Sequence, residues 1–190
     1  EQARGLIEAE GYFSANITTR VTDATDSQPM VVLLKIEPGP RTVIKKVQII
    51  FEGELDEQLA ADNEQAKALV QSLNESWALP EGQVFRQAEW SASKNATLAK
   101  LRAQGYPTAS WSGTSVTVDA ESKEATLFLV ADSGPAFFFG DIQVEGLKSQ
   151  PASAITNLSP FGRGAPYKEG QLVELQDRIQ KINLFDSVFV

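Results

Sequence analysis

The sequence has 190 residues, of which 42% are hydrophobic and 22% are charged, and its formal net charge is −8 at pH 7. This composition indicates a globular protein, and the negative charge disfavours nucleic-acid binding, because phosphate contacts need clustered Lys and Arg. The chain has no cysteine and no histidine, which excludes disulfides, thiol chemistry, and thiolate or imidazole metal ligands. The longest apolar runs, such as Met30–Leu34, are far shorter than the roughly 20 residues of a transmembrane helix.

The first 37 residues predict the end of a helix followed by two strands. The helix is expected to reach about Glu10, where Gly11 takes the left-handed position that commonly follows a helix. Strands are expected at about Ser14–Val21 and Met30–Glu37, which are rich in β-branched and apolar residues. This segment alone is too short to form a complete α+β domain.

The segment from Val43 to Asp132 predicts a complete α+β unit. A turn at Leu79–Gly82 separates two helical patterns, and the first of these begins after Asp56, a good helix-capping residue. The order is strand, helix, helix, strand, strand. The expected elements are a strand at about Val43–Phe51, helices at about Asp56–Asn74 and Arg86–Gln104, and strands at about Thr108–Val118 and Ala125–Ala131.

The last segment predicts the beginning of a similar unit. A strand is expected to start at Phe137, and a short helix lies near Pro151–Leu158. A helix at Lys168–Ile182 is indicated by apolar residues three or four positions apart. A further strand is expected at Asp186–Val190.

Two short patterns recur along the chain in the same order. A helix end followed by Gly and Tyr appears at Gly11-Tyr12 and Gly105-Tyr106, with a variant at Asn183-Leu184-Phe185. A Gly-Pro turn that precedes a strand appears at Gly39-Pro40 and Gly134-Pro135. Interleaved repeats of this kind predict a tandem array. The expected domains are the C-terminal part of a first domain at 1–39, a complete second domain at 40–133 and the N-terminal part of a third at 134–190.

These patterns resemble the POTRA (polypeptide-transport-associated) domains of the BamA/TamA superfamily of outer-membrane proteins. The resemblance rests on Gly11-Tyr12-Phe13 and on the run from Gly134 to Gly146, and it spans essentially the whole chain. The segment from Asn157 to Val190, with Pro160-Phe161, Gly164 and Tyr167, is most similar to the TamA-like branch. Pro107 and Asn183 depart from the family pattern. The resemblance implies an α+β fold of tandem β-α-α-β-β modules, each a three-stranded sheet with two helices on one face.

The resemblance also implies a location and partners. The expected location is the periplasmic side of the bacterial outer membrane, in a protein whose C-terminal part is a membrane β-barrel. The implied partners are unfolded outer-membrane or autotransporter proteins and an inner-membrane partner of the TamB type. No cofactor is expected.

The candidate binding site is an edge strand. Small sheets leave backbone groups unpaired at their edges, and these groups can bind an extended peptide. The resemblance implies that the open edge is Ser110–Asp119, which is β-prone and contains neither Pro nor Lys. The residues expected to contact a bound polypeptide are Trp111, Val116, Thr117 and Val118.

A second candidate patch is the aromatic run Phe137, Phe138 and Phe139. Side chains alternate between the faces of a strand, so three consecutive rings cannot all enter one core. The remaining ring is expected either to pack at the joint with the neighbouring domain or to form a binding patch.

No catalytic or metal site is predicted. A carboxylate-pair hydrolase is the natural enzyme hypothesis, but the acidic residues Glu52, Glu54, Asp56 and Glu57 are interpreted as helix caps and a solvated face. The alternative function is binding of peptidoglycan or another envelope glycan through tryptophans. The candidates for that function are Trp77, Trp90 and Trp111.

Overall fold

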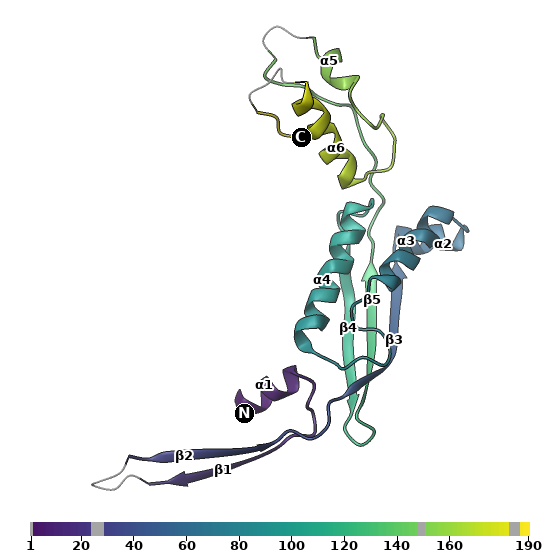
Figure 1. Cartoon of the computed structure of the whole chain (residues 1–190). Helices are drawn as coiled ribbons and strands as arrows, with labels where there is room; N and C mark the ends of the chain where they lie inside the picture. Colours follow the sequence, from purple (N-terminus) through teal and green to yellow (C-terminus); the bar gives the residue numbers. More distant parts are fainter. Residues whose placement is uncertain (1, 24–28, 148–150, 183–186) are drawn as a thin grey trace. The chain divides into compact units, whose positions relative to one another are not determined.

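The computed structural model describes residues 2–23, 29–147, 151–182 and 187–190. Figure 1 labels the helices and strands in chain order. The chain divides into two compact units by its internal contacts. The first unit comprises Glu1–Ile49, Ser76–Asn95 and Gly113–Leu129, and the second comprises Ile50–Glu75, Ala96–Ser112 and Val130–Val190.

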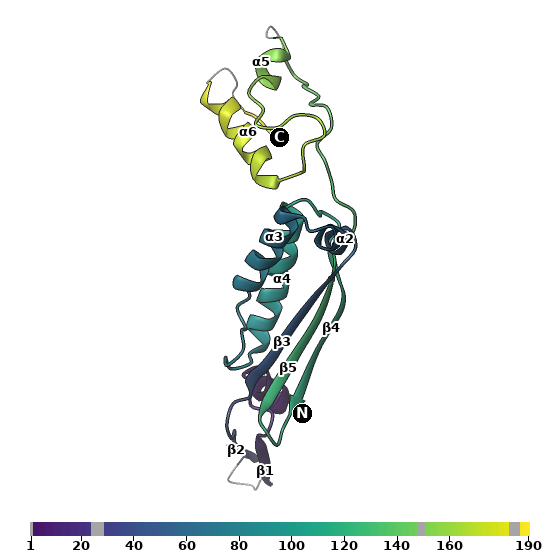
Figure 2. The ribbon, with the colours of Figure 1, turned by 90° about the vertical axis from the view of Figure 1, so that its right-hand side faces the viewer.

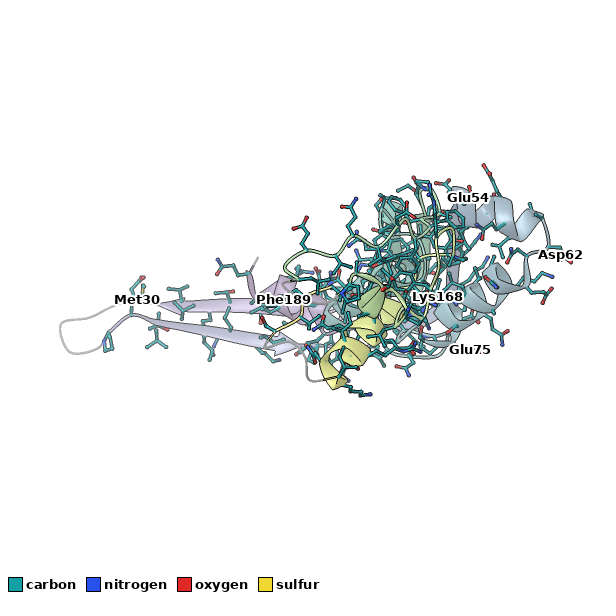
Figure 3. The ribbon with its side chains drawn as sticks, turned by 90° about the horizontal axis from the view of Figure 1, so that it is seen from above. Met30, Glu54, Asp62, Glu75, Lys168 and Phe189 are labelled. Carbon is teal, nitrogen blue, oxygen red and sulfur yellow. The ribbon has the colours of Figure 1, made fainter. Side chains whose placement is uncertain are left out.

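The chain begins with a helix and a two-stranded ribbon, as the sequence predicted. α1 spans Gln2–Ala9, β1 spans Asn16–Thr22 and β2 spans Val31–Glu37. β1 and β2 pair antiparallel. Every residue of β2 is exposed, and Figure 3 shows side chains projecting from the ribbon, with Met30 near its end.

The middle of the chain forms the predicted α+β unit. Its strands pair in the order β3-β5-β4, so β5 is central and the other two strands are edges. On β5, Ala125, Leu127, Leu129 and Ala131 are buried while the alternate residues are less so, because helices cover one face of the sheet (Figure 2). The elements are β3 Val43–Glu52, α2 Glu54–Ala60, α3 Glu64–Glu75, α4 Gln87–Ala103, β4 Ser110–Asp119 and β5 Glu124–Asp132.

The prediction of one helix from Asp56 to Asn74 is wrong, because two helices occupy this segment. The chain turns between α2 and α3, where Asp62 has a left-handed φ of 61°. The Oδ1 atom of Asn63 accepts hydrogen bonds from the backbone N–H groups of Gln65 (2.9 Å) and Ala66 (3.0 Å). Asn63 therefore caps a new helix, a role that Asn side chains favour.

The start of α2 also differs from the prediction, because its cap comes from a distant residue and not from Asp56. The Ser133 Oγ atom accepts a hydrogen bond from the Leu55 N–H at 3.0 Å. Gly53 stands at the N-cap position with a φ of 80°, and a Cβ atom there would lie 2.7 Å from Asp132 Oδ1. Only glycine fits this close approach without displacement.

The last part of the chain forms the two predicted helices but not the predicted strands. α5 spans Ser153–Thr156 and α6 spans Glu169–Lys181. In the described residues from Phe137 onward, strand pairing is limited to an isolated bridge between Phe138 and Pro166, and residues 187–190 are not in a strand. In the second unit, Phe138 has only this single bridge, whereas β3 pairs with β5 along the three-stranded sheet. The variant pattern at Asn183-Leu184-Phe185, together with Asp186, lies outside the described residues.

The internal repeat is visible in the backbone hydrogen bonds of the first unit. The Gly11 carbonyl accepts from the Thr42 N–H at 2.8 Å, and the Thr42 carbonyl accepts from the Phe85 N–H at 3.0 Å. The Gln83 carbonyl accepts from the Ile44 N–H at 2.7 Å. These bonds connect a helix end, the start of a strand and the loop before a helix.

The second unit contains the same set of bonds at the second copy of the pattern. The Gly105 carbonyl accepts from the Phe137 N–H at 2.8 Å, and the Phe137 carbonyl accepts from the Tyr167 N–H at 2.9 Å. The Ala165 carbonyl accepts from the Phe139 N–H at 2.9 Å. We call each set a joint: the first joint lies at residues 11 and 42–44, and the second at residues 105 and 137–139.

Candidate functional site

The predicted binding strand β4 lies at an edge of the three-stranded sheet. Trp111, Val116 and Val118 are half-buried, and Thr117 is exposed. Alternation of this kind follows from the strand geometry, since one face of the sheet packs on helices and the other meets solvent. The structure thus brings the four predicted residues onto one edge strand, with Trp111 in the second unit and the other three in the first.

The two edges of the sheet differ in how far they are covered. Along β3, the Ile44 carbonyl accepts from the Gly82 N–H at 2.8 Å, and Glu81 Oε1 accepts from the Val47 N–H at 3.4 Å. For β4, no backbone hydrogen bond outside the sheet involves residues 110–119 among the described residues. The loop at residues 81–84 therefore covers part of the β3 edge, and β4 is the more open edge.

The β4 edge is not uniform along its length. Thr114 and Ser115 are both exposed, between half-buried Gly113 and Val116, so the alternation of side chains is interrupted there. An interruption of this type is typical of a β-bulge, which twists an edge and limits regular pairing. After this interruption, half-buried and exposed residues alternate without a break from Val116 to Asp119.

Trp111 offers a binding partner only apolar surface. Its Nε1 atom is buried and has no hydrogen-bond partner among the described residues. An unpaired buried donor is destabilising, because it has lost its hydrogen bonds to water. Since this N–H does not face solvent, Trp111 cannot use it to bind a ligand at the surface.

The end of β4 is held by an acidic side chain. Asp119 Oδ1 accepts hydrogen bonds from the N–H groups of Glu121 (2.9 Å) and Ser122 (3.4 Å). These bonds, with the Ser122 side-chain hydrogen bond as the largest cause, lower the pKa of Asp119 below its ordinary value. They fix the hairpin that connects β4 to β5.

The acidic residues considered for catalysis lie in surface interactions. Glu52 Oε2 accepts from the Ser112 hydroxyl at 3.0 Å, and Glu54 Oε1 accepts from the Gln58 amide at 3.3 Å. Asp56 and Glu57 are exposed in the first turn of α2, where acidic residues interact favourably with the helix dipole. In the part of the chain that the structure describes, no group of three or more acidic residues could hold a metal ion.

The aromatic run at residues 137–139 divides between interior and surface. Phe139 is half-buried and stacks on Phe161, with ring centroids 3.7 Å apart. Phe137 is 42% exposed and Phe138 is 60% exposed. The backbone of Phe137 forms the second joint, while the exposed rings line a small cavity that the sequence did not predict.

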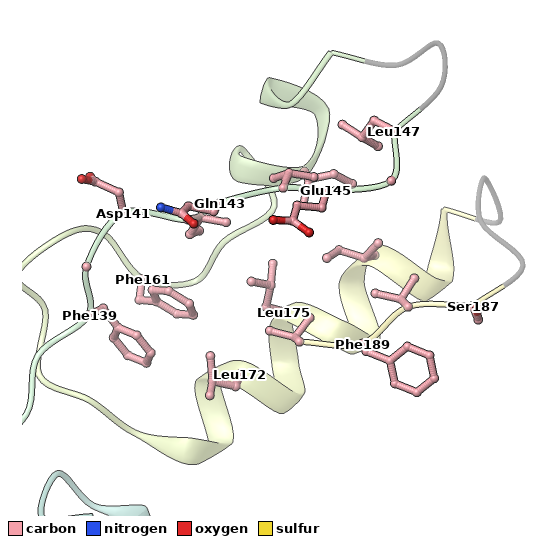
Figure 4. A pocket seen from close by; sticks show the side chains of 18 residues that line it. Phe139, Asp141, Gln143, Glu145, Leu147, Phe161, Leu172, Leu175, Ser187 and Phe189 are labelled. Carbon is pink, nitrogen blue, oxygen red and sulfur yellow. The ribbon is translucent and has the colours of Figure 1, made fainter.

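A larger cavity lies in the last part of the chain. Its volume is about 670 Å³, and it lies between residues 139–147 and α6. Figure 4 shows Phe139, Phe161, Leu172 and Leu175 directed into it, whereas Asp141 and Phe189 point away. Beside it, Ile155, Leu175 and Ile179 form a small hydrophobic core.

Two of the three tryptophans, Trp77 and Trp90, offer little surface for glycan stacking. Trp77 is 6% exposed and Trp90 is 5% exposed, and their rings meet edge to face with centroids 6.0 Å apart. The Trp77 indole N–H donates to the Leu79 carbonyl at 3.0 Å. Sugar-binding tryptophans must present a ring face to solvent, so these two residues do not support the glycan alternative.

Among the described residues, none of the helices has both the length and the apolar content to span a membrane. No protein-family model matches this chain. Several solved structures resemble it. The crystal structure of POTRA domains 3–5 of Haemophilus influenzae BamA is 21% identical, with 98% of this chain and 68% of that chain covered and a TM-score of 0.52.

BamA of Haemophilus ducreyi, in a crystal structure that lacks POTRA domains 1–3, is also 21% identical. The match covers 77% of this chain and 25% of that chain, with a TM-score of 0.54. At this identity the likeness concerns the fold. Together with the element order and the β3-β5-β4 sheet, it shows that the chain has the α+β fold of POTRA domains, as the sequence predicted.

Proposed function

We propose that this chain belongs to the periplasmic part of an outer-membrane protein of the BamA/TamA superfamily, where it acts as a scaffold in the assembly of other outer-membrane proteins. The POTRA fold and the likeness to BamA structures support this proposal. A scaffold function needs neither catalysis nor a cofactor, which agrees with the chemistry available to a chain without His or Cys.

We propose the domain boundaries 1–39, 40–133 and 134–190. The two joints support these boundaries, because the same backbone hydrogen bonds recur beside Gly39-Pro40 and Gly134-Pro135. The cavity of about 670 Å³ in the last part supports an incomplete third domain. In the second domain β5 is the central strand of the sheet and lies beside β3, so we propose that strands equivalent to β4 and β5 close this cavity in a complete domain.

The proposed activity is binding of extended polypeptide segments along the β4 edge. The observation that carries it is the difference between the edges: residues 81–84 cover part of β3, whereas no described residue outside the sheet makes a backbone–backbone hydrogen bond to β4. A peptide that pairs with β4 gains main-chain hydrogen bonds that are independent of its sequence. This mode suits a protein that binds many unfolded clients.

Within the superfamily, we propose the TamA-like branch. The segment with Pro160-Phe161, Gly164 and Tyr167 supports this assignment, since it is most similar to that branch. The corresponding clients are autotransporters and other unfolded outer-membrane proteins, and the corresponding partner is an inner-membrane protein of the TamB type. A membrane β-barrel after residue 190 belongs to the same proposal.

The edge is tested by two adjacent proline variants, Val116→Pro and Thr117→Pro. Backbone N–H groups of an edge strand alternate between the sheet and solvent. One proline therefore removes a bond within the sheet, and the other removes a donor that faces solvent. The variant that melts near the parent identifies the solvent-facing position.

Binding is measured by cross-linking to a synthetic peptide with alternating apolar and polar residues. The folded proline variant should lose most of the cross-linked product, whereas Thr117→Ala should retain it because no backbone donor is lost. Parental cross-linking by the folded proline variant would show that β4 is not the binding edge. The exposed aromatic patch at residues 137–138 would then be the next candidate.

A further inference from the structure

The second unit contains a cavity at the second joint. Its volume is about 250 Å³, and we call it the joint cavity. It is smaller than the ~300–1,000 Å³ of sites for drug-sized ligands, so it is suited to a single large side chain. It is lined by Gln58, Asn63, Gln65, Ala66, Leu69, Gln104, Gly105, Tyr106, Ala136, Phe137, Phe138, Pro166 and Lys168.

The lining of the joint cavity combines an apolar floor with an aromatic rim. Tyr106 and Ala66 are buried, and Leu69 is half-buried. Phe137 and Phe138 are the exposed aromatic residues of the lining. Aromatic rings bind other aromatic rings through offset or edge-to-face contacts. The apolar lining therefore favours an aromatic side chain as the occupant.

The joint cavity carries one positive charge beside several side-chain amides. Lys168 is the one charged residue of its lining, and it forms no ion pair among the described residues. Asn63 uses its Oδ1 atom to cap α3, and Gln58 uses its Oε1 atom to accept from the Tyr106 hydroxyl at 2.9 Å. Since Lys168 is the charged group of the lining and these two amide oxygens are engaged, the complementary ligand carries a carboxylate.

At the first joint, the tyrosine equivalent to Tyr106 is Tyr12, and a side chain of the same chain covers its ring. There the guanidinium of Arg41 lies over the Tyr12 ring, 5.0 Å from its centroid. Arg41 precedes Thr42 in the first joint as Ala136 precedes Phe137 in the second. The small Ala136 side chain cannot reach the Tyr106 ring as Arg41 reaches Tyr12. The second copy thus leaves open the space beside its tyrosine.

We propose that the joint cavity binds an aromatic side chain of a polypeptide partner whose neighbouring residue is acidic. The aromatic ring enters between Tyr106 and the exposed phenylalanines, and the carboxylate pairs with Lys168. This site goes beyond binding at the β4 edge and involves different residues, so either site can fail without the other.

The test is an NMR titration of the ¹⁵N-labelled chain with the peptide acetyl-Gly-Gly-Phe-Glu-Gly-Gly-amide. The backbone amides of Gly105, Phe137 and Lys168 should shift, with a dissociation constant on the order of 1 mM because one side chain is buried. The matched peptide with Lys in place of Glu should bind at least about tenfold more weakly, because it lacks the charge-assisted bond.

Two variants and one control locate the effect. Lys168→Glu should weaken binding of the Phe-Glu peptide at least about tenfold and should improve binding of the Phe-Lys peptide. Ala136→Arg should abolish both by placing a guanidinium beside Tyr106, as at the first joint. The control Lys181→Glu makes the same charge change at an exposed residue of α6 outside the lining and should leave binding unchanged.

Several results would overturn the proposal. They are equal affinity for the two peptides, equal loss in Lys168→Glu and Lys181→Glu, or shifts confined to residues outside the lining. Shifts confined to residues 116–119 would mean that the peptide binds the β4 edge only. If Ala136→Arg does not fold, the exchange of peptide preference in Lys168→Glu still decides the outcome.

Discussion

At the scale of single residues, glycines with left-handed backbone set the geometry of the joints. Gly11 has a φ of 93°, and a Cβ atom there would lie 2.4 Å from the backbone carbonyl oxygen of Phe85. Gly82 has a similar φ of 86°, but nothing lies within 4 Å of its Cβ position. Replacing either glycine with alanine would therefore strain the backbone, but only the Cβ atom at Gly11 would also clash with a neighbouring atom.

This difference gives a matched prediction. Gly11→Ala should lower the free energy of unfolding more than Gly82→Ala does, by at least about 1 kcal/mol, because backbone atoms must move as well. Urea unfolding of the two variants beside the parent measures the difference. Equal destabilisation would mean that the first joint tolerates a shift of its backbone.

Asp119 predicts a dependence of the β4–β5 hairpin on pH. Its pKa in the folded protein is lowered by hydrogen bonds from Ser122 and Glu121. A lowered pKa contributes stability above the unfolded value of about 3.9, and this contribution is lost as pH falls through the folded value. NMR titration of the Asp119 carboxyl should give a midpoint below that of a free Asp, and a midpoint at or above it would contradict these bonds.

At the scale of elements, the beginning of α2 depends on a side chain from the far end of the domain. Ser133 is fully buried, and its hydroxyl accepts from Leu55 N–H and donates to the Gly134 carbonyl. Ser133→Ala should lower the free energy of unfolding by about 1–2 kcal/mol, because a buried N–H loses its partner. The exposed Ser110→Ala is the control for urea unfolding, and a loss no greater than that of the control would argue against the remote cap.

Elements with strong local patterns were predictable from the sequence, and elements with remote partners were not. The apolar stripe of α4 and α6 and the β-prone pattern of β4 and β5 are local signals, and the structure confirms these elements. The break at Asp62 and the cap from Ser133 arise from tertiary contacts. The predicted strand at Phe137 is absent from the described residues, where Phe138 makes an isolated bridge with Pro166.

The candidate site shows the same division. The position of β4 at an edge followed from the resemblance and is confirmed by the sheet order. The cover of β3 by residues 81–84 has no local sequence signal, since a turn of this kind looks the same whether or not it contacts a strand. The Gly-Pro repeat aligns Ala136 with Arg41 in the sequence, but the contact of Arg41 with the Tyr12 ring has no sequence signal and is visible only in the structure.

At the scale of the whole molecule, the proposed domains predict different behaviour of their fragments. Residues 40–133 contain a complete sheet with a buried central strand, so this fragment should fold alone and unfold cooperatively. Residues 134–190 leave a cavity of about 670 Å³ beside α6, so this fragment should lose its helical signal at much lower temperature. Circular dichroism melts compare the two, and a cooperative melt of 134–190 at the higher temperature would contradict the boundaries.

The central claim is that β4 binds an extended polypeptide by adding it to the sheet, and hydrogen exchange of backbone amides tests it most directly. With a saturating amount of the alternating apolar–polar peptide, alternate amides between Val116 and Asp119 should become protected, because only the solvent-facing N–H groups gain a partner. The amides of β3 should exchange as before. Protection on β3 instead, or binding without any new protection on β4, would contradict the claim.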